Sequence, residues 1–280
     1  MTHLELFHGL VAAGMRMRYG NKPCRKAVLR VLWEKKHIMD AGFVDYYLMA
    51  FWLFRHYADS MGIGFWARGA VPSSIVCYCL RLTEVDPLKY GLHAARFVND
   101  EMPKFQIDIE ASRFDEFKKG TEELLQANAV DYDIPAIRKC LFQDLAPMEY
   151  LSRKKERPVP ENIDDELAQY ALYFPDTMDL YEEYNQQPET FDHLIYQEEM
   201  LDILRETFHV SGIKANQIRL AIQRRETERV EAYKKELFTK LKGITTSEAE
   251  TVWQRLISNP RAFLKAHAVS RVLAKYHYDF

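Results

Sequence analysis

Two carboxylates stand two residues apart where the sequence most clearly predicts a β-strand. Phe105, Ile107 and Ile109 alternate with polar neighbours, and this period of two predicts a strand over residues 105–109. Side chains two apart on a strand share a face, so Asp108 and Glu110 form a candidate catalytic pair. Carboxylates can hold the metal ions that neutralise charge during phosphoryl transfer, which makes Asp108 a candidate metal ligand. A lone, solvent-facing acid at a strand end is the simpler interpretation.

Basic side chains on the C-terminal helices form a second candidate group. The arginine fork pairs with a phosphate through two hydrogen bonds, so arginines along one helix favour contacts with a phosphate backbone. The candidates are Arg219, Arg224 and Arg225, with Lys214, Arg229, Lys234 and Lys235 nearby. An exposed basic helix without a ligand is the alternative interpretation for each residue taken separately.

The elements that must position these residues are mainly helices. Apolar spacing and Gly or Pro breaks predict helices over 4–19, 24–37, 45–61, 114–128, 165–171, 191–208, 214–242, 247–257 and 260–276, and a helix start near 72–74. The fold class is therefore mainly α (α+β), with a small sheet near residue 107. A linker over 154–162, which contains Pro158 and Pro160, divides the chain into regions 1–153 and 163–280.

Charge is distributed unevenly over the 280 residues. Residues 1–160 sum to +3, residues 161–204 contain thirteen acids and no Lys or Arg, and residues 205–280 sum to +7. Separate charged faces can steer an anionic ligand.

The four cysteines are too few and too scattered for a disulfide framework, which favours free thiols. No apolar run is long enough to span a membrane, and no signal peptide is evident, so we expect a cytoplasmic protein.

Four ordered blocks in the first half resemble the bacterial DNA polymerase III alpha subunit, a C-family replicative polymerase. Its glycine-rich loop corresponds to Phe65–Ser74, and its Asp-Pro-Leu signature corresponds to Leu82–Tyr90. Its Arg-Phe-Leu-Asn segment resembles Arg96–Asn99, and its aspartate strand resembles Met102–Ile109. The resemblance implies a reduced palm-like region over 1–153.

The second half resembles the fingers of the same family. Ala171–Leu180 is similar to its Leu-Tyr-Arg-Pro-Gly-Pro-Met segment, and Ile195-Tyr-Gln-Glu-Glu-Met200 to its Val-Tyr-Gln-Glu-Gln-Val block. Gln217–Arg225 and Phe263–Ala268 resemble its basic helix and its Phe-Asn-Lys-Ser-His-Ala segment. Lys265 and His267 keep the Lys-x-His spacing of that segment, so the resemblance implies that they too are candidate phosphate-binding residues. The resemblance implies a helical, fingers-like region over 163–280.

The resemblance also implies that the polymerase chemistry is impaired. Lys104 and Gln106 align with the first two metal-binding aspartates of the family strand, so only Asp108 remains. A register-shifted pair of Asp108 and Glu110 is one alternative, and alignment of Gln106–Ile109 with a later aspartate strand is another. In either case a third carboxylate is not located. If the enzyme is active, it needs Mg²⁺; otherwise it needs no cofactor.

The phosphate-binding loop also lacks residues of the family pattern, which implies that nucleotide binding is impaired as well. Arg68, Gly69 and Ser74 remain as candidate nucleotide-binding residues. The aromatic pair Phe65 and Trp66 replaces small residues, and Pro72 removes a backbone donor, which predicts a filled pocket.

Three functions follow as hypotheses. The first is a catalytically impaired polymerase-like protein that binds DNA or a replication partner through the basic fingers-like face. The second is an active, minimal metal-dependent DNA-directed DNA polymerase, a nucleotidyltransferase. The third is a helical protein-interaction module that binds no nucleic acid.

Overall fold

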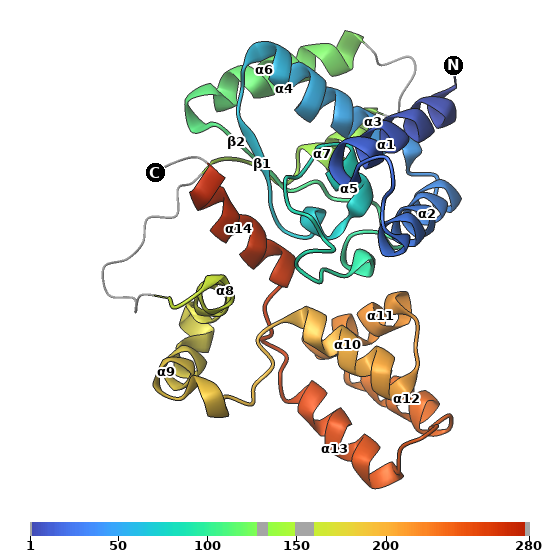
Figure 1. Ribbon diagram of the computed structural model, residues 1–280, viewed down its shortest axis with the longest axis vertical. Coiled ribbons are helices and arrows are strands. Elements are labelled where there is room, and N and C mark those ends of the chain that lie inside the picture. The colour runs from blue at the N-terminus through green and yellow to red at the C-terminus, as the bar shows by residue number, and fades with distance from the viewer. Residues whose placement is uncertain (1, 128–133, 149–159, 278–280) are drawn as a thin grey trace. The chain divides into compact units, whose positions relative to one another are not determined.

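The computed structural model describes residues 2–127, 134–148 and 160–277 (Figure 1). The chain forms two compact units, residues 1–152 with 269–280, and residues 153–268. The predicted linker over 154–162 lies mostly outside the described residues. The fold is mostly helical with one small sheet, which confirms the predicted fold class. Among the described residues, no helix is long and apolar enough to cross a membrane.

The first unit consists of helices around a three-stranded sheet. Its helices are α1 (His3–Tyr19), α2 (Arg25–Asp40), α3 (Val44–Ala50), α4 (Ala58–Met61), α5 (Ile75–Cys79), α6 (Phe114–Ala127), α7 (Ile134–Leu141) and the end of α14 (Lys265–His277). A π-helical segment, Phe51–Tyr57, joins α3 to α4, so the predicted helix over 45–61 runs without interruption. This run is almost wholly apolar and packs into the core, where Leu53 and Phe54 are fully buried.

The sheet has the order β1–β2–β3, with β2 (Ile107–Ile109) in the centre. Strand β1 (Phe65–Ala67) pairs antiparallel to β2, which places Trp66 opposite Asp108. Strand β3 (Leu145–Pro147) pairs parallel to β2. The predicted strand is confirmed at β2, while its two neighbours were not foreseen. Strands of three residues leave almost no periodic signal.

The second unit is helical throughout its described part. Its helices are α8 (Ile163–Leu172), α9 (Met178–Gln186), α10 (Gln197–Phe208), α11 (Gly212–Gln223), α12 (Thr227–Phe238), α13 (Thr246–Ile257) and the start of α14. Figure 1 shows α10, α11, α12 and α13 gathered in one bundle. The fully buried Trp253 lies in its core with Leu201 and Ile218. The expected helices over 191–208 and 260–276 begin later than predicted, at Gln197 and Lys265.

The single long helix predicted over 214–242 is wrong, because the chain turns at Arg225. Arg225 has a φ of 56°, in the left-handed region. Its amide donates to Ile222 O at 3.1 Å, and the Glu226 amide donates to Ala221 O at 3.0 Å. These two bonds form a Schellman motif, a helix ending that usually requires glycine at this position. Because the residue at this position is arginine and not glycine, the sequence does not indicate that α11 ends here.

Candidate functional site

Asp108 lies at the centre of a buried cluster of charges. It occupies the middle of the central strand, and its side chain is only 1% exposed. Arg68 Nε donates to its Oδ1 at 2.6 Å, and Arg271 Nη1 lies 2.7 Å from its Oδ2. The interpretation of Asp108 as a solvent-facing acid is therefore wrong. Arg68 hydrogen-bonds to one carboxylate oxygen and Arg271 forms an ion pair with the other, so the cluster sums to one positive charge.

Backbone contacts hold both arginines in place. Arg68 directly follows β1, and its amide donates to Gln106 O at 2.8 Å. Its Nη2 also donates to Asp144 O at 3.0 Å. Arg271 follows Ser270 on α14, and Trp66 Nε1 donates to the carbonyl oxygen of Ser270 at 2.9 Å. Trp66 therefore fixes the turn of helix that carries Arg271.

Glu110 does not complete a metal site with Asp108. It lies just beyond the end of β2 and accepts hydrogen bonds from Ser112 Oγ at 2.5 Å and from Gly64 N at 3.4 Å. These bonds hold the pKa of Glu110 below its ordinary value. No group of three metal-ligating side chains that could hold an ion occurs in the described part of the chain. Mg²⁺ does not fit the donors around Asp108, because two arginine cations already bind its oxygens.

A buried network occupies the start of α5, where the sequence suggested a phosphate. Glu34 of α2 is fully buried, and its carboxylate accepts hydrogen bonds from Ser74 Oγ at 2.7 Å and from the amides of Ile75 and Val76, each at 3.1 Å. Arg30 Nε neutralises it at 2.6 Å. The carboxylate therefore takes the position that an anion would take at a helix N-terminus. Ser74 is itself fully buried against Glu34.

Gly69 keeps the loop after β1 close to Gln106. Its φ is +62°, and a Cβ atom there would lie 1.5 Å from Gln106 Oε1. Gly91 has a similar φ of +64° but no atom within 4 Å of such a Cβ. Gly69 thus has two reasons to be glycine, the backbone conformation and the close contact, whereas Gly91 has only the first.

We expect Gly69→Ala to destabilise the first unit by about 1–3 kcal/mol, because left-handed strain adds to the clash with Gln106. Gly91→Ala is the matched control for the strain alone, and adding Gln106→Ala to Gly69→Ala should recover the difference between the two single variants. Denaturant unfolding measures all four free energies. Equal losses for Gly69→Ala and Gly91→Ala would show that the contact with Gln106 is not restrictive.

Part of the chain is similar to known proteins. Residues 5–132 match the family model of the bacterial DNA polymerase III alpha NTPase domain. An error-prone DNA polymerase of Cutibacterium acnes is 36% identical over 181 residues, which cover 58% of this chain and 16% of that protein. The DNA polymerase III alpha subunits of Borreliella burgdorferi and Bacillus subtilis are 39% and 38% identical over 109 and 107 residues, or 38% and 37% of this chain and 9% of each subunit.

The chain is related to the bacterial DNA polymerase III alpha subunit. This confirms the resemblance that the ordered blocks indicated. The chain spans between 9% and 16% of the length of these relatives, so their activity is not transferred to it by similarity alone. The region matched by the polymerase family model includes Glu34, Arg68 and Asp108.

The basic residues predicted from the fingers of the polymerase do not form one face. Arg219 is 2% exposed, and its guanidinium donates to Asn216, Gln197 and Gln223. It is therefore a buried structural residue of the bundle and is not on the surface. Such burial is visible in the sequence only as its position among the apolar residues of α11.

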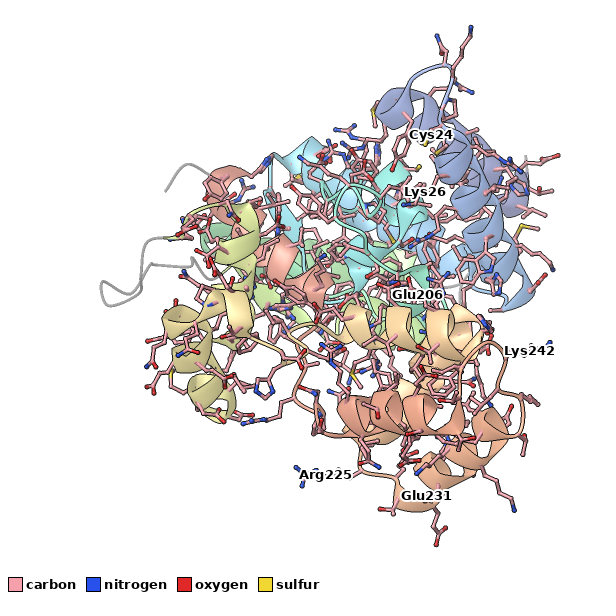
Figure 2. All side chains as sticks on the ribbon, turned by 60° about the horizontal axis from the view of Figure 1, so that its bottom comes forward. Cys24, Lys26, Glu206, Arg225, Glu231 and Lys242 are labelled. Atoms are coloured by element: carbon pink, nitrogen blue, oxygen red, sulfur yellow. The ribbon has the colours of Figure 1, made fainter. Side chains whose placement is uncertain are left out.

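Most of the neighbouring surface cations are paired with acids. Lys214 pairs with Glu236 at 2.7 Å, and Lys234 pairs with Glu250 at 2.8 Å. Glu226 accepts from Arg229 at 3.0 Å and lies 3.8 Å from Arg224. Arg225 is exposed at the turn between α11 and α12 and points away from the bundle (Figure 2).

Lys265 and His267 stand at the start of α14. Lys265 Nζ lies 5.4 Å from the ring centroid of Tyr196, and the Lys265 amide donates to Glu198 Oε2 at 2.8 Å. His267 stacks on Tyr170, with ring centroids 6.3 Å apart. Neither contact brings them to Arg224 or Arg225. The predicted phosphate-binding residues therefore occupy several separate places in the second unit.

The sequence analysis missed two residues of these buried charge clusters, Arg271 and Glu34. Arg271 lies four positions after His267 in an expected helix, but nothing in its spacing points to Asp108. Glu34 carries a weak signal, since this acid directly after Trp33 follows Arg30 by one helical turn. An i,i+4 pair on an apolar face is the pattern that could have indicated a buried charge.

Proposed function

We propose that this chain is a polymerase-related protein that has lost nucleotidyl transfer and binds DNA through its second unit. The observation that carries the first part is the pair of arginines on Asp108. A two-metal mechanism requires carboxylates that can bind cations, and two guanidinium cations this close to Asp108 neutralise it and repel a metal ion. Lys104 and Gln106, where the polymerase carries aspartates, support the same conclusion.

The nucleotide-binding half of the reaction is affected as well. Glu34 occupies the amides at the start of α5, and its negative charge would repel a triphosphate. Gln106 fills the space beside Gly69. The loss therefore extends to both parts that a polymerase needs, the metal ligands and the phosphate cradle.

DNA binding is supported by charge and by family. Within the second unit, residues 205–268 carry a net charge of +6, and the relatives are DNA polymerases. Arg225 presents an exposed guanidinium at a turn. Arg224 beside it is 55% exposed, and its guanidinium lies 3.8 Å from the Glu226 carboxylate. Replacing this weak, exposed ion pair by a contact with a DNA phosphate costs little. We place the contact with the DNA backbone at this turn.

Primer extension tests the loss of catalysis. Incubation with a primed template, all four deoxynucleotides and Mg²⁺ or Mn²⁺ should give no extension above that of Asp108→Asn, because the wild-type carboxylate is not available to metal. Extension by the wild type that is abolished in Asp108→Asn would refute the proposal and establish the minimal polymerase.

A salt-dependent binding assay tests the DNA contact. Fluorescence anisotropy with a labelled duplex should show an affinity for DNA that falls as the salt concentration rises. Arg225→Gly should reduce the slope of the logarithm of the binding constant against the logarithm of the salt concentration by about the amount expected for the loss of one phosphate contact. Glycine suits the left-handed conformation at this position, so the charge is removed without destabilising the helix end. Lys26→Gln, an exposed lysine of the first unit (Figure 2), is the matched control and should leave the slope unchanged. Negligible affinity at low salt, or equal effects of both variants, would favour a protein-interaction module.

A further inference from the structure

The first unit contains a cavity of about 130 Å³ between β1 and the last turn of α14 (Figure 1). Its lining includes two arginines, Arg55 and Arg81, and the hydroxyl-bearing Thr83. Because one water molecule takes about 30 Å³ in the liquid, the space suits a ligand group of only a few non-hydrogen atoms. The charged residues of the Asp108 cluster do not line the cavity, so it is separate from that cluster.

The two arginines of the cavity have guanidinium donors that no described residue uses. Arg55 Nε is buried and donates no hydrogen bond, although it lies 2.9 Å from Asp59 Oδ2 in an ion pair. The Arg81 side chain forms neither a hydrogen bond nor an ion pair with a described residue. Each guanidinium carries five N–H donors, and buried donors normally have an acceptor. Two unused sets of donors at one cavity therefore indicate an acceptor from outside the chain.

The acids of the lining do not neutralise Arg81. Glu84 accepts a hydrogen bond from Arg18 Nη1 at 2.7 Å, and Asp59 pairs with Arg55. Each acid is thus balanced by another arginine, which leaves the charge of Arg81 in excess. Because the guanidinium fork binds phosphates and carboxylates, this excess favours an anionic ligand.

Arg81 stands at a backbone position that favours glycine. Its φ is 58°, in the left-handed region. Its amide donates to Tyr78 O at 3.1 Å, and the Leu82 amide donates to Cys77 O at 2.9 Å. These bonds form a Schellman motif at the end of α5, the same type of ending that Arg225 gives α11. Strained residues that are not glycine cluster at functional sites, so the Arg81 side chain calls for a functional explanation.

The donors of the cavity distinguish among anions. Thr83 Oγ1 accepts from the Val85 amide at 3.2 Å, which leaves its hydroxyl hydrogen to donate to a ligand. A phosphate group has three strong acceptor oxygens and up to two negative charges. These match two guanidinium groups and one hydroxyl better than the two oxygens and the single charge of a carboxylate.

We propose that this cavity binds a phosphate group through the guanidinium groups of Arg55 and Arg81 and the hydroxyl of Thr83. The site lies in the first unit and does not depend on the DNA contact proposed at Arg225. Free inorganic phosphate and the terminal phosphate of a small monoester share this chemistry.

Calorimetric titration of the full chain with inorganic phosphate, at an ionic strength held constant with NaCl, tests the proposal. Phosphate should bind at one site per chain. Arg81→Gly should weaken binding about tenfold, because charge-assisted hydrogen bonds are lost. Glycine suits the left-handed conformation, so the same variant should not lower the midpoint of urea unfolding.

Arg225→Gly is the matched control, because it removes the same charge from the same type of helix end in the second unit. It should leave the affinity for phosphate unchanged. Arg55→Lys should weaken binding about threefold, since lysine keeps the charge but lacks the guanidinium fork.

The outcomes separate the cavity from general attraction of anions. Tighter binding of glycerol 3-phosphate than of inorganic phosphate would assign the site to a phosphate monoester, and the reverse order would assign it to the free ion. The proposal fails if neither probe saturates a single site, or if Arg81→Gly and Arg225→Gly weaken binding equally, as diffuse attraction requires.

Discussion

Replacement of Glu34 by glutamine should destabilise the first unit by about 3–5 kcal/mol, because it leaves the half-buried Arg30 without its counterion and the fully buried donors around position 34 without their acceptor. The carboxylate also accepts from Ser74 Oγ and from the amides of Ile75 and Val76. An amide side chain has one acceptor oxygen and an NH₂ group that would face these donors. The loss combines an uncompensated charge with unsatisfied buried donors.

Tryptophan fluorescence during urea unfolding measures this effect, since Trp33, Trp52 and Trp66 lie in the first unit and only Trp253 lies in the second. Asp40→Asn is the control on the same helix, because the pair of Asp40 with Lys36 is largely exposed and should contribute little. The double variant Arg30→Met, Glu34→Met should recover much of the loss, as apolar replacement of a buried pair often does. A Glu34→Gln variant as stable as Asp40→Asn would show that the network is not a structural element.

The scaffold was more predictable than the site, and the reason is the range of the interactions. The helices α1, α2 and α6 follow from local apolar spacing, and the sequence predicts each within a few residues. The ordered motif blocks also survive in the sequence independently of the fold. The pair formed by Arg271 and Asp108 depends on residues more than 160 positions apart, so no local pattern contains it.

Two errors show where local rules fail. The break at Arg225 uses a left-handed residue that is not glycine, so propensity favours a continuous helix there. Asp108 stands in a strand with alternating neighbours, yet the sheet is covered on both faces, so Ile107, Asp108 and Ile109 are all buried. Alternation predicts an exposed acid only when one face of the strand meets water.

Asp108→Asn should destabilise the first unit by about 3–5 kcal/mol, because Asp108 is the buried counterion of two arginines. Arg68 and Arg271 are only 16% and 15% exposed, so water cannot replace the lost charge at either guanidinium. Asp59→Asn provides the comparison, since the pair of Asp59 with Arg55 at 2.9 Å is partly exposed and contributes much less. Adding Arg271→Met to Asp108→Asn should restore part of the stability by removing one of the two uncompensated cations.

The sign of the stability change caused by Asp108→Asn distinguishes an ion-pair residue from a metal ligand. In a metal site without its metal, clustered carboxylates repel each other, so neutralising one of them stabilises the protein. Around Asp108 the neighbours are cations, and the same substitution must destabilise it. Mg²⁺ provides the second criterion, because a ligand that binds the folded state raises stability by about 2.7 kcal/mol at one hundred times its Kd. We expect millimolar Mg²⁺ to leave the melting temperature of the wild type and of Asp108→Asn unchanged relative to Na⁺ at equal ionic strength. An increase in melting temperature with Mg²⁺ that occurs only in the wild type would mean that Mg²⁺ displaces the arginines from Asp108.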